Sequence, residues 1–144
     1  MIAIIDIDGT ISDLSHRLHF IKGEPKEWDK FFDAMDMDIP VPGTRFLVWA
    51  LSSYYTIIYL TGRPGSHRIQ TMKWLVKNEF PEGDLIMRKA GDHRPDTIVK
   101  VELYRDEVLS QRGEAKLVIE DRKAVVEMWR ALGILTLQPK DGDY

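Results

Sequence analysis

The chain opens with Ile2-Ala3-Ile4-Ile5-Asp6-Ile7-Asp8-Gly9-Thr10, an apolar run followed by two carboxylates and a glycine. The apolar run predicts a buried strand, and Asp-x-Asp-Gly predicts a turn that leaves it. Loops at the carboxyl ends of parallel strands form the crevice in which open α/β folds bind ligands. We therefore expect Asp6 and Asp8 to reach this crevice, where carboxylates suit a magnesium ion and a phosphoryl group.

Apolar runs recur along the chain and alternate with segments of helical period. The runs are 2–5, 56–60, 85–87, 117–119 and 134–137. This alternation predicts an α/β fold, in which helices flank a parallel five-strand sheet and right-handed crossovers bring the strand ends to one edge. Two of these helices are expected to bury the apolar stripes Phe46, Leu47, Ala50, Leu51 and Ile69, Met72, Leu75, Val76.

One segment, residues 11–42, does not fit the alternation. It contains a predicted short helix at 27–34 and then an acidic loop with two prolines. We interpret it as a small cap inserted over the site after the first strand. The whole chain has 144 residues, of which 44% are apolar, which predicts one domain over 1–144.

The cysteine content, the apolar runs and the net charge exclude several classes of site and partner. The chain has no cysteine, which excludes disulfides, zinc-thiolate sites and a thiol nucleophile. Its first apolar run is broken by Asp6 and Asp8, and no later run reaches membrane-spanning length, so we expect a cytoplasmic protein with no membrane partner. The formal net charge of −3 gives no overall field for holding nucleic acid, so a polyanion would need a local basic patch.

Three further groups of reactive residues follow the first motif in order. Thr61-Gly62-Arg63 ends the second run, Asp96 and Lys100 lie one turn apart on a predicted helix, and Glu120-Asp121-Arg122 follows the fourth run. Each group alone has a plainer explanation, because such residues are common in turns, helix caps and exposed helix faces. Their joint occurrence at the ends of predicted strands favours an active site.

With these motifs the chain resembles the haloacid dehalogenase (HAD) superfamily of aspartate-nucleophile phosphatases, through DIDGT, LTGRP, the lysine of RPDTIVK, and VIEDR. The resemblance spans the domain and implies a Rossmann-like fold. More narrowly, Arg17 and EDRKAVVEMWRALG make the chain similar to the 3′-phosphatase domain of phage polynucleotide kinase/phosphatase enzymes. This implies a phosphoric monoester hydrolase that acts in nucleic acid repair.

The chemistry of phosphate monoesters assigns roles to these residues. A carboxylate can attack the dianion only where nearby charges neutralise both partners. We expect Asp6 to be the nucleophile that forms an aspartyl phosphate, Asp8 to be the general acid and base, and Lys100 to neutralise the equatorial oxygens. Asp96 is expected to orient Lys100 by an i, i+4 pair. The residues expected to bind the substrate or its phosphate are Gly9, Arg17, Thr61, Gly62, Arg63 and Asp96.

Magnesium requires hard oxygen ligands in octahedral geometry. The Asp6 carboxylate, the Asp8 backbone carbonyl and Asp121 are the expected ligands. Glu120 departs from the family pattern, which most often has aspartate at this position. Its extra methylene displaces the carboxylate by about a bond length, so we expect Glu120 in the outer shell of the metal.

The substrate is less closely specified. Basic residues near the strand ends could line a track that binds nucleic acid, or they could simply balance the charge of acidic residues on the surface. These residues are Arg17, Arg63, Arg88, Lys89, Arg94 and Arg122. The leading hypothesis is a Mg²⁺-dependent phosphatase of DNA or RNA 3′ ends, with a ligase or kinase in the same pathway. The chain has no kinase phosphate-binding loop, so we expect a stand-alone phosphatase. Alternatives are a phosphatase of mononucleotides or other small phosphomonoesters, and a non-catalytic subunit that binds phosphorylated ends.

Overall fold

The computed structural model describes residues 1–142. Its five-strand sheet is parallel throughout and has the order β5-β4-β1-β6-β7, which confirms the predicted Rossmann-like α/β fold. The strands are β1 Ile2–Ile5, β4 Thr56–Pro64, β5 Asp84–Arg88, β6 Ala115–Ile119 and β7 Leu135–Leu137. Strand β4 is longer than predicted, so Thr61, Gly62 and Arg63 lie within it, where the register with β5 is irregular.

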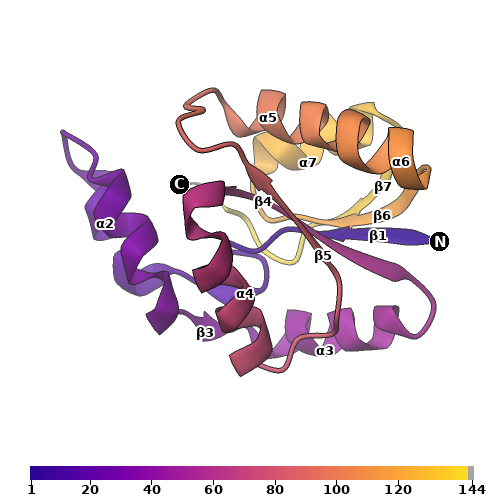
Figure 1. The fold of residues 1–144 in the computed structure, drawn as a ribbon, viewed down its shortest axis with the longest axis horizontal. Helices are drawn as coiled ribbons and strands as arrows, with labels where there is room; N and C mark the ends of the chain where they lie inside the picture. The colour runs from indigo at the N-terminus through magenta and orange to yellow at the C-terminus, as the bar shows by residue number, and fades with distance from the viewer. Residues whose placement is uncertain (143–144) are drawn as a thin grey trace.

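Helices cover both faces of the sheet (Figure 1). One face is covered by α5, α6 and α7, and the other by α3 and α4. The bounds are α3 Pro42–Ser52, α4 Arg68–Lys77, α5 Asp96–Leu103, α6 Ser110–Arg112 and α7 Lys123–Ala131, with a π-helical segment η4 at Tyr104–Leu109 and a 3₁₀ turn η3 at Gly65–His67. Within the described residues 1–142, no helix combines the length and the apolar character needed to cross a bilayer.

The alternation of side chains along β1 divides the core into two layers. Ile2 and Ile4 belong to the layer that also contains Tyr104 and Trp129. Ala3 and Ile5 belong to the opposite layer, under α3 and α4. Burial of β1 on both faces makes it the centre of the sheet, so the turn that follows it lies in the middle of the carboxyl edge.

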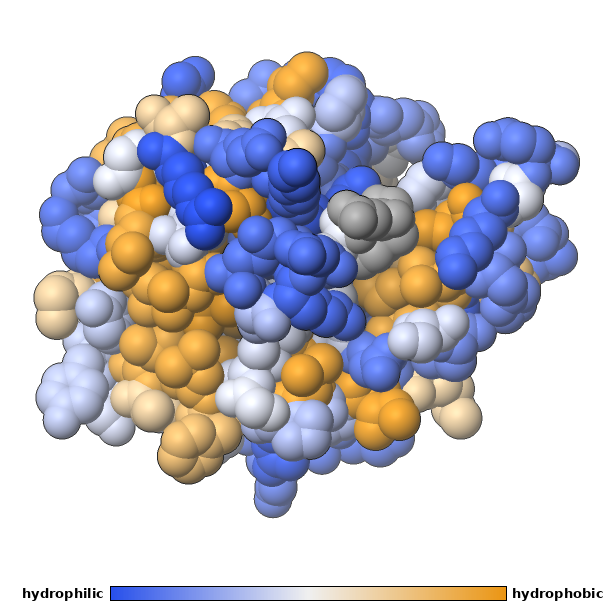
Figure 2. All heavy atoms as spheres, turned by 180° about the vertical axis from the view of Figure 1, so that it is seen from behind, coloured by the Kyte–Doolittle hydropathy of each residue, from blue (hydrophilic) through white to orange (hydrophobic). Residues whose placement is uncertain are grey.

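The predicted apolar stripes of α3 and α4 are confirmed only in part, because Leu47, Leu51 and Leu75 pack into the core layer under these helices and the other members do not. Phe46 is 77% exposed and Ile69 is 70% exposed. The rest of the buried faces is formed by Thr44 and Val48 on α3 and by Thr71 and Trp74 on α4. Burial of the large Trp74 side chain places Ile69, Met72 and Val76 on the exposed side of α4, an orientation that is set by packing and not by periodicity. Seen from behind, the surface likewise carries broad apolar areas beside hydrophilic ones (Figure 2).

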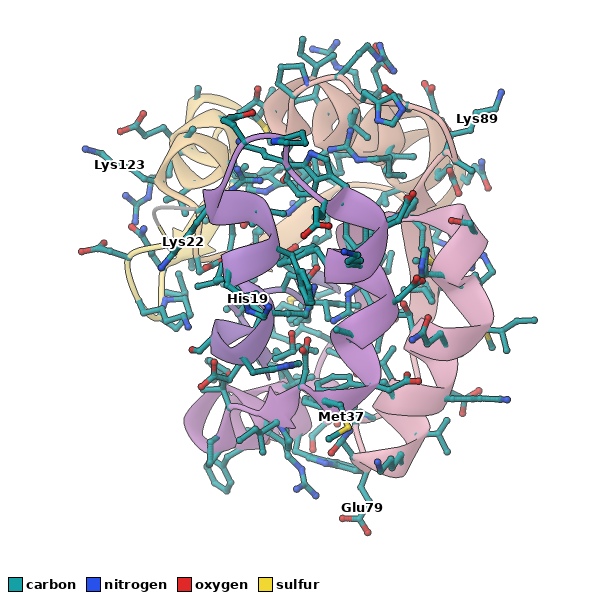
Figure 3. The ribbon with its side chains drawn as sticks, turned by 90° about the vertical axis from the view of Figure 1, so that its left-hand side faces the viewer. His19, Lys22, Met37, Glu79, Lys89 and Lys123 are labelled. Atoms are coloured by element: carbon teal, nitrogen blue, oxygen red, sulfur yellow. The ribbon has the colours of Figure 1, made fainter. Side chains whose placement is uncertain are left out.

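The cap lies between β1 and α3. It consists of β2 Ser12–Asp13, η1 Ser15–Arg17, α1 His19–Lys22, α2 Trp28–Asp33, η2 Ala34–Met37 and β3 Ile39–Pro40. The two short strands pair in antiparallel fashion, and Leu14, Ile21 and Phe31 form a small core of the cap. Figure 3 shows the cap helices crossing the end of the molecule, with α4 on one side of them and α7 on the other. The predicted helix at 27–34 is close to α2.

Candidate active site

Three neighbouring strands deliver the candidate residues to one place. Because β1 lies between β4 and β6, the residues that follow Ile5 are adjacent to Thr61 and Glu120. The turn after β1 folds around the carbonyl of Ile7, which accepts hydrogen bonds from the backbone N–H groups of residues 10, 11 and 12 at 3.0–3.2 Å. Gly9 has φ = 82° in this turn, a conformation that favours glycine.

A buried cluster of carboxylates forms the centre of the site. Asp6, Glu120 and Asp121 are buried, and one carboxylate oxygen from each lies within 4.8 Å of the others. The ammonium of Lys100, from the middle of α5, donates to Asp6 Oδ1 at 2.7 Å and to Glu120 Oε2 at 2.6 Å. Three acidic groups and one cation therefore share a space from which most water is excluded.

Burial and charge shift the pKa values in this cluster. Burial, together with the Glu120 carboxylate, raises the pKa of Asp6 to about 7, although Lys100 acts in the opposite direction. Burial alone would lower the pKa of Lys100, but Asp6 and Glu120 raise it above its usual range. Burial also raises the pKa of Glu120. Lys100 is thus a cation, and the raised pKa values of Asp6 and Glu120 mean that the site favours the neutral forms of these two carboxyl groups.

Thr10 was assigned no role from the sequence, yet it lies inside the cluster. Its hydroxyl is 3.1 Å from Asp6 Oδ2 and 3.2 Å from Asp121 Oδ1. It therefore bridges the carboxylates that follow β1 and β6. The residue was visible in the DIDGT motif, but its bridging position depends on the turn around Ile7 and could not be predicted from spacing.

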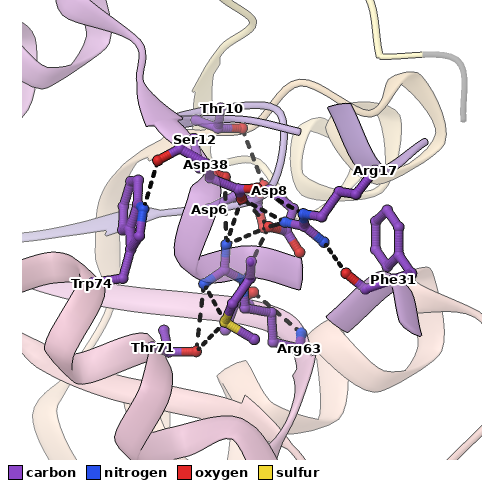
Figure 4. A network of polar contacts seen from close by, with 12 residues as sticks. Asp6, Asp8, Thr10, Ser12, Arg17, Phe31, Asp38, Arg63, Thr71 and Trp74 are labelled. Carbon is purple, nitrogen blue, oxygen red and sulfur yellow. Dashed lines mark hydrogen bonds and ion pairs between the residues drawn. The ribbon is translucent and has the colours of Figure 1, made fainter. Parts of the chain in front are cut away.

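Asp8 lies two residues after Asp6 but in a different electrostatic environment (Figure 4). Arg17 Nη2 donates to Asp8 Oδ1 at 2.6 Å, and Arg63 donates to the same oxygen through Nη2 at 2.6 Å and Nε at 2.9 Å. Burial alone would raise the pKa of Asp8, but the two guanidinium groups hold it well below its usual range. Asp8 is therefore a carboxylate in this structure.

Both arginines are fully buried, and the cap supplies most of their other contacts. Arg17 Nη1 donates to the Phe31 carbonyl at 3.2 Å, and the Arg17 guanidinium lies 4.2 Å from the centre of the Phe31 ring. Arg63 Nη1 contacts Met35 Sδ at 3.1 Å. Asp38, which follows η2, accepts from both guanidinium groups. The expected substrate-binding arginines thus also fasten the cap to the sheet.

Asp96 does not pair with Lys100 as predicted. It is the first residue of α5, and its carboxylate instead bonds Arg88 Nη2 and Arg122 Nη1. It also packs closely on Gly62, where a β-carbon would lie 2.8 Å from Asp96 Oδ1. Asp96 therefore ties together three loops of the site, because Lys100 reaches past it to the more deeply buried Asp6 and Glu120.

Two arginines of the predicted basic track form their hydrogen bonds with other residues of the protein. Arg88 donates to the carbonyls of Gly62 at 3.0 Å, Asp92 at 2.9 Å and Arg94 at 2.6 Å, which organises the loop before α5. The side chain of Arg94 is bonded to Asp92 and Glu102. Lys89 is exposed and points away from the cap in Figure 3.

A family model confirms the resemblance that the motifs indicate. The model of the polynucleotide kinase PNKP phosphatase domain matches residues 1–144. The chain belongs to this phosphatase family. Its Asp6, Lys100 and Asp121 therefore occupy the carboxyl edge of a PNKP-type phosphatase domain, and divalent metals are the cofactors that HAD phosphatases generally use.

Solved structures agree with the PNKP-type fold. A chain of the Pnkp1/Rnl/Hen1 complex matches 99% of this chain with a TM-score of 0.84 and 29% sequence identity. A chain of the Pnkp1/Rnl/Hen1 RNA repair complex also matches 99% of this chain, with a TM-score of 0.81 and 28% sequence identity. The present chain spans 47% and 43% of their lengths. The class C acid phosphatase of Bacillus anthracis with tungstate bound shares the fold, with a TM-score of 0.63 and 20% identity over 83% of this chain and 51% of its own.

Proposed function

We propose that this domain removes 3′-phosphate groups from DNA or RNA ends, with Mg²⁺ as its cofactor and an aspartyl phosphate as its intermediate. The observation that carries the proposal is the buried contact of Asp6 with Lys100, beside Glu120 and Asp121, in a domain of the PNKP phosphatase family. A carboxylate needs such neutralising surroundings to attack a phosphate dianion.

The reaction divides into two displacements. An oxygen of Asp6 attacks the phosphorus, the bond to the 3′ oxygen breaks, and its electron pair leaves on that oxygen. Water then attacks the phosphorus of the aspartyl phosphate, and the bond to Asp6 breaks. Lys100 touches Asp6 before the reaction and holds a positive charge beside the oxygens that become more negative.

Asp8 is the proposed acid and base of these two steps. It gives a proton to the leaving 3′ oxygen in the first step and takes one from the attacking water in the second. The carboxylate form that Arg17 and Arg63 stabilise suits the second step, and the proton that Asp8 gives in the first step is taken up from water once the substrate is bound. The negative charge of a bound phosphoryl group favours this uptake, because it opposes the two guanidinium groups.

The carboxylate cluster fits a hard divalent cation. Oxygens of Asp6, Glu120 and Asp121 lie close enough together to share one ion, and carboxylate oxygens are the donors that Mg²⁺ prefers. We propose that Asp6, the Asp8 carbonyl and Asp121 hold the ion, and that the bond from Lys100 keeps Glu120 in the outer shell. When bound, the ion neutralises charge on the phosphoryl oxygens.

Metal binding should stabilise the protein more at high pH than at low pH. The pKa of Asp6 rises from 3.8 to about 7 on folding without metal, so the folded state binds more protons than the unfolded state between these values. Stability from this group is therefore lost as the pH rises through that window. Since metal binds the deprotonated carboxylates, Mg²⁺ should raise the Tm more at about pH 8 than at about pH 5. Equal increases in thermal melts would contradict the metal assignment, and Asp6→Asn should weaken the pH dependence.

The segment after β7 closes over Asp121. The Gly142 N–H and the Gln138 side chain donate to the Asp121 carbonyl at 3.0 and 2.9 Å. A β-carbon on Gly142 would lie far inside van der Waals contact of Asp121 Oδ2. Gly142→Ala should therefore displace this carboxylate and weaken Mg²⁺ binding by roughly tenfold, measured by calorimetric titration. Gly43→Ala is the matched control, because no heavy atom lies within 4 Å of its new methyl group. Equal metal affinity in the two variants would exclude this role for Gly142.

The 3′-end substrate is supported by the similarity of this chain to a chain of the Pnkp1/Rnl/Hen1 RNA repair complex. A ligase acting on the resulting 3′-hydroxyl is the proposed partner.

One observation favours mononucleotides as substrates instead. The cap is fastened to the start of α4 by His67, whose Nε2 is 3.0 Å from Asp33 Oδ1, and by Gln70, which donates to the Asp33 carbonyl at 3.1 Å. A cap held in this way restricts entry of a polymer.

Substrate choice is tested by Mg²⁺-dependent phosphate release. We would compare kcat/KM for 3′-phosphorylated DNA and RNA oligonucleotides with the values for 3′- and 5′-mononucleotides, using Asp6→Asn as the blank. The proposal expects the 3′-phosphorylated oligonucleotides to be preferred. Preference for mononucleotides would replace the end-healing function by that of a nucleotide phosphatase.

A further inference from the structure

Asp38 is a buried acid that lies outside every motif of the chain. It follows η2 in the cap, and its side chain is completely shielded from solvent. Its backbone is fixed from two sides, because its N–H donates to the Met35 carbonyl at 3.0 Å and its own carbonyl accepts from Trp74 Nε1 at 2.9 Å. The carboxylate therefore has a defined position between the cap and α4.

The Asp38 carboxylate holds both arginines that hold Asp8 (Figure 4). Arg17 binds it through two nitrogens, with Nε 2.7 Å from Oδ1 and Nη2 2.6 Å from Oδ2. Arg63 Nη2 donates to Oδ2 at 3.2 Å. In each arginine, Nη2 is shared between Asp38 and Asp8. Two guanidinium groups thus bridge two carboxylates, and the four charges balance.

The two arginines fix the orientation of the Asp8 carboxylate. Both arginines donate to the same oxygen, Asp8 Oδ1, and a carboxylate held at one oxygen by two planar groups has little freedom to rotate. The planes of those groups are set in turn by Asp38. Without its charge, both cations would be left with Asp8 as their shared carboxylate partner and would move toward it.

We propose that Asp38 is a positioning residue, which orients the acid and base Asp8 through Arg17 and Arg63. The inference rests on the proposed function, since it takes the role of Asp8 from there. Asp38 and Arg17 belong to the cap, whereas Asp8 follows β1 and Arg63 lies in β4, so the contacts that orient Asp8 join the cap to the sheet.

The experiment uses leaving groups of different basicity. p-Nitrophenolate departs without a proton, whereas a sugar alkoxide requires one, so only the alkoxide substrates depend on Asp8 in the first step. We would compare Asp38→Asn with wild type on p-nitrophenyl phosphate, a 3′-mononucleotide and a 3′-phosphorylated oligonucleotide. Asp36→Asn is the matched control, because Asp36 is an exposed acid of the same segment.

The expected result is a fall in kcat/KM, which reports the steps up to departure of the leaving group, of about 100-fold on both alkoxide substrates and of less than about fivefold on p-nitrophenyl phosphate. Asp36→Asn should leave all three rates unchanged. An equal loss on all three substrates would reduce Asp38 to a structural residue and overturn the proposal, as would a loss confined to the oligonucleotide. The oligonucleotide-to-mononucleotide ratio of wild type reports separately on the proposed substrate.

A second variant keeps the test informative if Asp38→Asn does not fold. His16 Nε2 lies 2.8 Å from Asp38 Oδ1, and the His16 side chain is partly exposed, so His16→Ala loosens Asp38 without stranding a buried charge. We expect a smaller loss with the same dependence on the leaving group. A folded His16→Ala protein with equal losses on all substrates, or with none, would count against the proposal.

Discussion

Asp6→Asn should abolish phosphate release while leaving the fold intact. The amide has the shape of the carboxyl group but cannot attack phosphorus, so we expect kcat to fall by at least about 10,000-fold on every phosphomonoester. The measurement is release of p-nitrophenolate and of phosphate from a 3′-phosphorylated oligonucleotide. Residual activity within about tenfold of wild type would remove Asp6 from the role of nucleophile.

The same substitution should not destabilise the metal-free protein. Burial and the neighbouring Glu120 raise the pKa of Asp6, which means that the folded state tolerates its charge poorly. A neutral side chain removes that penalty, so the Tm at about pH 8 without metal should be equal to or above that of wild type. A large fall in Tm would show that the lost activity reflects misfolding.

Lys100→Met should have the second largest effect, and it should act on both activity and stability. The substitution keeps most of the side-chain volume but leaves Asp6 and Glu120 facing each other without their shared cation. Loss of one preorganised charge from a site of this kind lowers kcat by about 100- to 1,000-fold. Loss of one partner of a buried ion pair costs about 3–5 kcal/mol of unfolding free energy.

The control for Lys100→Met is Lys123→Met, because Lys123 is exposed at the start of α7 and points into solvent in Figure 3. Urea unfolding and initial rates would be measured on both variants. We expect Lys123→Met to match wild type. If Lys100→Met also matched wild type in stability, the ion pairs of Lys100 would not be part of the folded protein in solution.

The sheet could be predicted because its strands are buried on both faces and read as continuous apolar runs. The orientation of α4 could not be predicted in full. In α4, Ile69 and Met72 lie at helical spacing, yet the buried side of that helix carries Thr71 and Trp74. Periodicity identifies an amphipathic helix, but the large Trp74 ring fits only where the sheet and Phe80 receive it, and that depends on tertiary packing.

Most of the candidate site was visible in the sequence because strand ends bring distant residues together. The motifs predicted that Asp6, Lys100 and Asp121 share one edge, and the structure brings them to it. The contacts of Thr10 and Asp38 could not be predicted, since a bridging hydroxyl and a cap acid leave no pattern of spacing. Helical spacing predicted that Asp96 pairs with Lys100, but Asp96 instead accepts hydrogen bonds from Arg88 and Arg122, which lie in other loops.

The stereochemical course at phosphorus tests the central claim most directly. A substrate made chiral at phosphorus by sulfur and oxygen isotopes would be hydrolysed in isotopically labelled water, and the configuration of the released thiophosphate determined. Each in-line displacement inverts the phosphorus, so attack by Asp6 followed by attack of water predicts overall retention. Inversion would mean that water attacks the substrate directly and that Asp6 does not form an aspartyl phosphate.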